Sequence, residues 1–212
     1  MEWSEDSQGG SAADPPTTTA AATTEFAHGG SYAAKLTNAA VGAYDTSRVF
    51  RQAVYPSEAY YSAWYYLPQA YAATASWTIM QFRAPTAQDP SVISYLLDLD
   101  LRSLPGGELI LSVYDHRPEY LRSPTPPTAL FVPVGRWFHV EALFRNTADD
   151  RGRFSVWLDG QLNYDIQRPF GINTVVYWSP CNSSYDFTPS DAAIYVDDAA
   201  ISVVRLTPNG VF

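Results

Sequence analysis

Residues 136–160 constrain the fold more than any other stretch, because two runs of alternating apolar and polar residues flank a polar turn. Successive side chains on a β-strand point to opposite faces, so this pattern predicts an antiparallel hairpin. The predicted inward face is apolar and comprises Phe138, Val140, Ala142, Phe144, Phe154, Val156 and Leu158. The predicted outward face carries polar and aromatic groups from His139, Glu141, Arg145 and Trp157. The hairpin therefore predicts a sheet with one buried face and one face that meets solvent or a ligand.

Further runs of β-prone, alternating residues predict most of the remaining strands. They cover residues 49–55, 59–67, 77–83, 95–102, 108–114, 172–178 and 193–204. The predicted outward side chains include Trp64, Gln81, Arg83, Asp98, Asp100, Arg102, Tyr114 and, just beyond its strand, His116. Because strands that follow one another in sequence are often neighbours in a sheet, we expect these outward faces to merge into one functional surface.

The composition favours many short strands over helices. Aromatic residues make up 15% of the 212 residues, and the chain contains 16 Pro and 12 Gly, a content typical of strands joined by turns. We expect one all-β domain over residues 1–212, a length that can bury one sizeable core. Residues 4–24 are rich in Ser, Thr, Ala and Pro and predict a long loop or a mobile arm. Residues 179–190 predict an irregular loop.

The net charge of −9 weighs against nucleic acid and an anionic membrane surface as partners. It also disfavours a polyanionic substrate, although a local basic groove would still accept one. No apolar run reaches the ~18 residues that a membrane span needs, so we expect no membrane insertion. The single cysteine, Cys181, forms no internal disulfide and predicts a packed thiol. We expect a monomer.

Three stretches together carry a family resemblance. They are Glu2-Trp3 with FAHGGSYAAKL at 26–36, the hairpin RWFHVEALFR…GRFSVWLDG, and YVDDAAIS at 195–202. They resemble the concanavalin A-like, or laminin G-like, jelly rolls of carbohydrate-active proteins, which include lectins, family 16 glycosidases and polysaccharide lyases. The resemblance implies a β-sandwich of two antiparallel sheets, one of them concave, with a glycan laid across the concave face. It also implies a secreted or extracellular domain whose leader peptide has been trimmed.

The resemblance suggests two enzyme classes, and the residues argue against one of them. Family 16 glycosidases carry Glu-x-Asp-x-Glu on a concave strand, whereas this chain has Asp98-Leu99-Asp100-Leu101-Arg102, and a guanidinium cannot serve as the acid. A lyase needs a group that neutralises a uronate carboxylate, a base, and an acid for the leaving oxygen. The sequence MQFR is similar to the Gln-Ile-His strand of alginate-type lyases, with arginine in place of histidine. The lyase hypothesis assigns catalysis to Gln81, Arg83, Tyr114 and His139, with Arg102 and His116 available to complete the site.

Carbohydrate binding without cleavage is the leading hypothesis, and a lyase that cleaves a uronate-containing glycan by β-elimination is the alternative. Sugar rings stack on aromatic side chains, and their hydroxyls pair with planar polar groups. The candidate binding residues are Trp64, Asp98, Asp100, Arg102, His116, Glu141, Arg145 and Trp157, with Tyr66, Gln81 and Tyr114 as further contributors. The structural alternative is that Trp64 and Tyr66 belong to the core and that the charged residues of 98–102 form an internal ion-pair ladder.

Two adjacent aspartates interrupt the last predicted strand. In related β-sandwich domains an aspartate at this place joins backbone carbonyls in binding a structural calcium ion, which prefers oxygen ligands. We expect Asp197 to be the ligand, with Glu2 or a residue outside the chain as its acidic partner. The alternative is that Asp197 and Asp198 are solvated and blunt the edge of a sheet.

Overall fold

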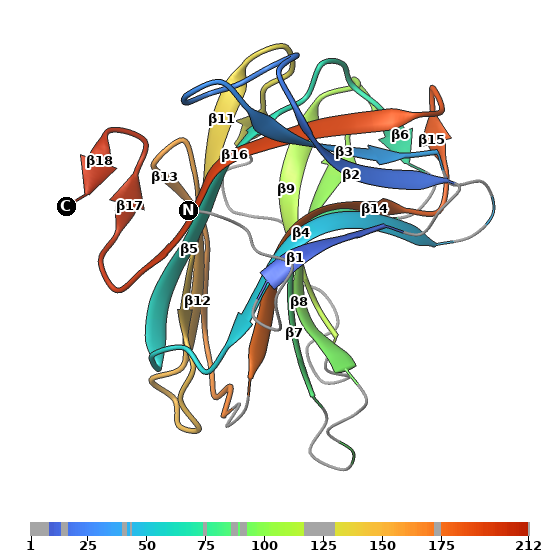
Figure 1. The fold of residues 1–212 in the computed structure, drawn as a ribbon. Coiled ribbons are helices and arrows are strands. Elements are labelled where there is room, and N and C mark those ends of the chain that lie inside the picture. Colours follow the sequence, from blue (N-terminus) through green and yellow to red (C-terminus); the bar gives the residue numbers. More distant parts are fainter. Residues whose placement is uncertain are drawn as a thin grey trace.

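The computed structural model describes residues 9–13, 17–39, 42, 44–73, 76–85, 89, 93–116, 130–171 and 175–211. This part of the chain forms two seven-stranded antiparallel sheets and two short two-stranded ones, without helices. Figure 1 shows the two large sheets as the layers of a curled sandwich. The predicted all-β jelly-roll sandwich is therefore confirmed. The described residues include no helix with the length and apolar character needed to cross a membrane.

The first large sheet, called sheet A here, contains the strands on which the site is built. Its order is β1 (Gly9–Ala13), β4 (Asp45–Ala53), β14 (Val176–Ser184), β7 (Trp77–Pro85), β8 (Ile93–Ser103), β9 (Leu109–Asp115) and β10 (Phe131–Val132). The second, sheet B, has the order β13 (Gln161–Gln167), β12 (Arg153–Leu158), β11 (Trp137–Arg145), β5 (Glu58–Tyr66), β16 (Ala192–Ser202), β3 (Ala33–Asn38) and β2 (Thr18–Thr23). The short sheets pair β15 (Phe187–Thr188) with β6 (Ala72–Ala73), and β17 (Leu206–Thr207) with β18 (Gly210–Val211).

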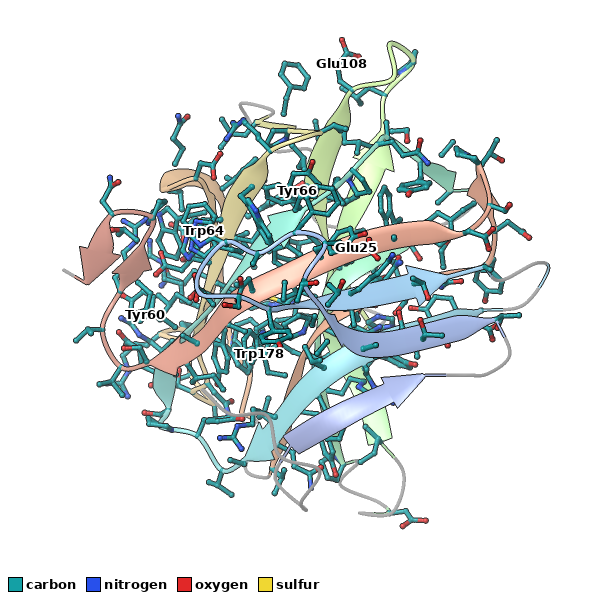
Figure 2. All side chains as sticks on the ribbon, turned by 45° about the horizontal axis from the view of Figure 1, so that its top comes forward. Glu25, Tyr60, Trp64, Tyr66, Glu108 and Trp178 are labelled. Atoms are coloured by element: carbon teal, nitrogen blue, oxygen red, sulfur yellow. The ribbon has the colours of Figure 1, made fainter. Side chains whose placement is uncertain are left out.

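The core lies between sheets A and B and is rich in aromatic rings. Tyr61 of β5 meets Phe82 of β7 edge-on, with ring centroids 5.0 Å apart, and Phe82 meets Phe154 of β12 at 5.5 Å. Trp178 of β14 is fully buried beside them, and Figure 2 labels it near the centre of the fold. These contacts bury the apolar faces that the alternation predicted. Every residue of the predicted inward face of the 136–160 hairpin is 3% exposed or less.

The expectation that the outward faces of consecutive strands merge into one surface is confirmed for β7, β8 and β9 and is wrong for β5. Strands β7, β8 and β9 are neighbours in sheet A, whereas β5 pairs with β11 and β16 in sheet B. In this jelly roll the chain crosses from one sheet to the other between β5 and β7. The outward faces of the two sheets therefore point away from each other, on opposite sides of the core.

Two loop predictions also differ from the structure. Within residues 4–24, the described parts include β1, which pairs with β4, and β2, which pairs with β3. The small Thr and Ala side chains of β2, most of them partly or fully exposed, suit a strand at the edge of sheet B. The predicted irregular loop at 179–190 begins instead as a continuation of β14 to Ser184, held between β4 and β7. The predicted calcium partner Glu2 lies outside the described residues.

Candidate functional site

A cleft opens on the face of sheet A that points away from the core. Its volume is about 730 Å³, and it is lined by Tyr44, Ser76, Tyr95, Asp98, Asp100, Arg102, Ser112, Val113, Tyr114, His116 and Tyr185. Strand register explains the gathering, because Gln81 pairs with Asp98 and Asp98 pairs with Tyr114 across three neighbouring strands. Directly opposed residues share a face of the sheet. Leu97, Leu99 and Leu101, which alternate with the aspartates of β8, point into the core.

An imidazole and a carboxylate form a close pair in this cleft. His116 Nε2 lies 2.7 Å from Asp98 Oδ2, and the His116 side chain is 28% exposed whereas that of Asp98 is 7% exposed. The His116 backbone N–H donates to the Leu96 carbonyl, and the His116 ring stacks on Tyr95 at 5.0 Å. Burial raises the pKa of Asp98, and the hydrogen bond from His116 opposes that rise. A carboxylate that holds one ring nitrogen orients a histidine for proton transfer at the other.

A second carboxyl group lies two residues further along β8. Asp100 Oδ1 accepts a hydrogen bond from Thr78 Oγ1 at 2.7 Å, and the side chain is 5% exposed. Burial first, and the charge of Asp98 second, raise the pKa of Asp100 to about 7. The predicted ion-pair ladder with Arg102 is not present, because Asp98 pairs with His116, Asp100 with Thr78, and Arg102 is exposed.

Arg83 lies between two aromatic rings, one of which, Tyr95, lines the cleft. Its guanidinium carbon is 5.7 Å from the centroid of the Tyr95 ring and 6.0 Å from that of Tyr177. The side chain is half-buried, and its Nε has no hydrogen-bond partner among the described residues. Rings on both sides hold the planar cation in place. The group therefore offers hydrogen-bond donors to an anionic ligand.

Two tyrosines that the sequence did not single out complete the cleft. Tyr44 precedes β4, Tyr185 follows β14, and their rings meet at 5.2 Å. Gln81 Nε2 lies 3.3 Å from the Tyr44 hydroxyl, and burial raises the pKa of Tyr44 well above its usual value. Both residues flank strands rather than alternate within them, so the period-two pattern carried no signal for either.

The remaining predicted site residues lie on the outer face of sheet B, and a segment near the chain end covers part of this face. Glu141 is fully buried there and accepts hydrogen bonds from Arg205 Nε at 2.8 Å and from the Leu206 backbone N–H at 2.5 Å. The Arg205 guanidinium also lies 4.3 Å above the Trp157 ring. Arg145 is paired with Glu58 at 2.5 Å. These side chains are engaged within the protein and do not adjoin the cleft.

His139 and Trp64 lie under the segment before β3. The His28 ring stacks on Trp64 at 3.8 Å, and Trp64 packs against His139 at 5.2 Å. Figure 2 labels Trp64 and Tyr66 close to this segment, in which Phe26 stacks on Tyr66 at 4.4 Å. Burial lowers the pKa of His139 to about 4. His139 is therefore a neutral, packed residue that lies on the other sheet from Gln81 and Arg83.

Asp197, the predicted calcium ligand, accepts backbone hydrogen bonds. Its Oδ2 receives the N–H of His28 at 2.8 Å and that of Gly29 at 3.1 Å, while Asp198 pairs with the His28 ring. Within the described ranges, no cluster of three or more His, Cys, Asp or Glu side chains is arranged to hold a metal ion. The calcium site stays a prediction.

Comparisons with known proteins agree with the fold. An endo-β-1,4-glucuronan lyase from the fungus Trichoderma reesei superposes with a TM-score of 0.68 and 15% identity, over 90% of each chain. The cellulose-induced protein Cip1 gives 0.66 and 16%, over 97% of this chain and 95% of its own. The alginate lyase Aly36B, bound to an alginate trisaccharide, gives 0.58 and 13%, over 90% and 99%. No curated protein matches the chain in sequence.

A family profile gives the assignment that these distant structural likenesses cannot give. The profile described as "Polysaccharide lyase" matches residues 3–178, which include β1 to β13 and all the cleft residues except Tyr185. The match covers most of the chain and agrees with a jelly-roll sandwich that carries a polar cleft on one sheet. The chain therefore belongs to the polysaccharide lyase family.

Proposed function

We propose that the protein cleaves a uronate-containing polysaccharide by β-elimination in the cleft of sheet A. The observation that carries the proposal is the gathering of a carboxylate-paired imidazole, a tyrosine hydroxyl and a held guanidinium on three adjacent strands. His116 and Tyr114 have ring centroids 4.7 Å apart, and Arg83 lies over the ring of Tyr95, which stacks on His116. A β-elimination needs a base, an acid and a cation for the carboxylate.

Each group has one role in the proposed reaction. Arg83 binds the uronate carboxylate and stabilises the negative charge that develops when the neighbouring C5 proton leaves. His116, oriented by Asp98, takes the C5 proton. The C5–H electron pair becomes the C4–C5 double bond, and the bond from C4 to the glycosidic oxygen breaks. Tyr114 donates its proton to that oxygen, which leaves as the hydroxyl of the next sugar.

The family match and the similar structures favour the lyase over carbohydrate binding without cleavage. One of the similar structures is named as a glucuronan lyase and several are named as alginate lyases, and glucuronan and alginate are both polyuronates. We therefore place a polyuronate, with glucuronan first and alginate second, as the substrate. The overall charge of −9 does not oppose this, because Arg102 lines the cleft and Arg83 lies over the ring of Tyr95, another lining residue.

The test incubates the protein with glucuronan, alginate and a neutral β-1,4-glucan while following ultraviolet absorbance and reducing ends together. A lyase produces both signals on a polyuronate and neither on the glucan. Reducing ends without absorbance would indicate hydrolysis, and retention on an affinity gel with neither signal would indicate a binding module. Either result would overturn the proposal.

A matched pair of histidine variants ties the activity to the cleft. His116→Asn should lower kcat by about 10²- to 10⁴-fold, the usual contribution of a positioned base. His28→Asn, on the outer face of sheet B, should keep the wild-type rate. Equal losses in both variants would show that the reaction does not take place on sheet A.

A further inference from the structure

Two buried hydrogen-bond acceptors lie on directly opposed residues of β7 and β8, one of which, Asp98, lines the cleft. Gln81 Oε1 and Asp98 Oδ1 are both buried, and neither has a hydrogen-bond partner among the described residues. Gln81 and Asp98 are register partners on β7 and β8 and share the cleft face. An unpaired buried acceptor costs about 1–3 kcal/mol, so two on neighbouring side chains call for a common cause.

The nitrogen end of the Gln81 amide has a single partner within the described part of the chain, the Tyr44 hydroxyl. Its Nε2 lies 3.3 Å from the Tyr44 hydroxyl, a long contact, and that hydroxyl is itself able to donate. The two ends of an amide have the same shape and are distinguished only by what their partners donate or accept. Turning the Gln81 amide by half a rotation exchanges its two atoms, so the oxygen faces the Tyr44 hydroxyl and the nitrogen takes the place of the unpaired oxygen. The oxygen then accepts from Tyr44, and the nitrogen is a donor on the residue directly opposite Asp98.

We propose that Gln81 bridges Tyr44 and Asp98, accepting the Tyr44 hydroxyl at Oε1 and donating from Nε2 to Asp98 Oδ1, and so acts as a positioning residue for His116. Asp98 is then held on both oxygens, by Gln81 on one side and by His116 on the other. The consequence for catalysis rests on the proposed function. In this arrangement Gln81 acts on the base through Asp98.

The competing arrangement keeps the amide as it is and places a proton on Asp98. A neutral Asp98 would donate from Oδ1 to Gln81 Oε1, and this also satisfies both atoms. The charged and titratable groups that act on Asp98 are His116 and Arg83, which favour its ionised form, and Asp100, Tyr44 and Cys181, which do not. The charge-assisted bond from His116 at 2.7 Å is the closest of these contacts and favours the ionised form.

Neutron diffraction from deuterium-exchanged wild-type crystals distinguishes the two arrangements directly. We expect deuterium on the amide end that faces Asp98, and none on Asp98 Oδ1. Deuterium on the end that faces Tyr44, together with a deuteron on Asp98, would overturn the proposal. This experiment needs neither a variant nor a substrate.

A titration of the Asp98 carboxyl carbon by NMR gives an independent test. The Gln81→Met variant keeps the length of the side chain and removes the donor, so the Asp98 midpoint should rise by about 1 pH unit. If Asp98 is instead protonated and donates to Gln81, the same variant should lower the midpoint. An unchanged midpoint would place Gln81 elsewhere, and would fit a direct role on substrate. If the variant does not fold, the neutron map decides alone.

Both measurements separate this inference from the proposed function. A protein with no lyase activity but with the expected neutron map and midpoint shift would refute the function and keep the bridge. An active lyase with the opposite map would keep the function and refute the bridge.

Discussion

Replacing Arg83 by lysine tests the central role that the structure assigns to a guanidinium. Lysine keeps the positive charge but loses the planar fork, so it cannot bind a carboxylate through two parallel hydrogen bonds. It also loses the stacking between Tyr95 and Tyr177, whose centroids lie 5.7 and 6.0 Å from the guanidinium carbon. The variant therefore separates geometry from charge at one position.

The expected loss follows from the hydrogen bonds that disappear. One charge-assisted bond to the carboxylate contributes about 1.5–3 kcal/mol, which corresponds to about a 10- to 150-fold lower kcat/KM. Because the charge of the uronate grows as the C5 proton leaves, most of the loss should fall on kcat. Arg83→Met, which removes the charge as well, should lose more than Arg83→Lys.

The assay is the initial rate of ultraviolet absorbance on the most responsive polyuronate, at several substrate concentrations. Arg136→Lys is the matched control, since the Arg136 side chain is 64% exposed and the residue directly precedes β11 of sheet B. Thermal unfolding of each variant excludes a trivial loss of folded protein. If Arg83→Lys retains kcat/KM within about threefold of wild type, the Arg83 guanidinium does not bind the uronate carboxylate through two hydrogen bonds that matter for the reaction.

Three further predictions concern stability and the division of the molecule into two faces. Arg205→Ala should lower the free energy of unfolding, measured in urea, by about 2 kcal/mol, because it removes a hydrogen-bond partner from the buried Glu141. Arg136→Ala, which removes an exposed ion pair, should lower it by about 0.5 kcal/mol or less. Equal losses in the two variants would show that the hydrogen bond from Arg205 to Glu141 does not stabilise the fold. The pKa of Asp100 is raised to about 7 in the folded protein, whereas in the unfolded chain the carboxyl group titrates near the ordinary pKa of an aspartate. Between these two pKa values the folded protein binds a proton that the unfolded chain has released. The contribution of Asp100 to stability is therefore complete in acid and is lost as the pH rises toward about 7. Asp100→Asn should flatten the fall in unfolding free energy between about pH 4 and about pH 7 by up to about 1.4 kcal/mol per pH unit, and an unaltered slope would contradict the raised pKa. His139→Ala should keep its lyase rate at temperatures well below unfolding, and a loss as large as that of a cleft variant would contradict the separation of the two sheets.

Local alternation determined the strands and their inward faces. The apolar residues of β11 and β12 are buried as predicted, and so are Leu97, Leu99 and Leu101 of β8. Alternation also placed Gln81, Asp98 and Tyr114 on the outward sides of their strands, and the register confirms that they share one face. Both results depend only on the period of a strand, which is a property of the backbone.

Only the tertiary structure decided which strands share a sheet. Alternation with a period of two predicts which side chains lie on the same face of one strand. It carries no information on which strand pairs with it, because that pairing depends on contacts between residues far apart in sequence. His139 and Glu141 were therefore predicted as outward residues, yet the structure buries both against the segments that contain His28 and Arg205. For the same reason Tyr44 and Tyr185, which flank their strands, reach the cleft without any signal in the sequence pattern.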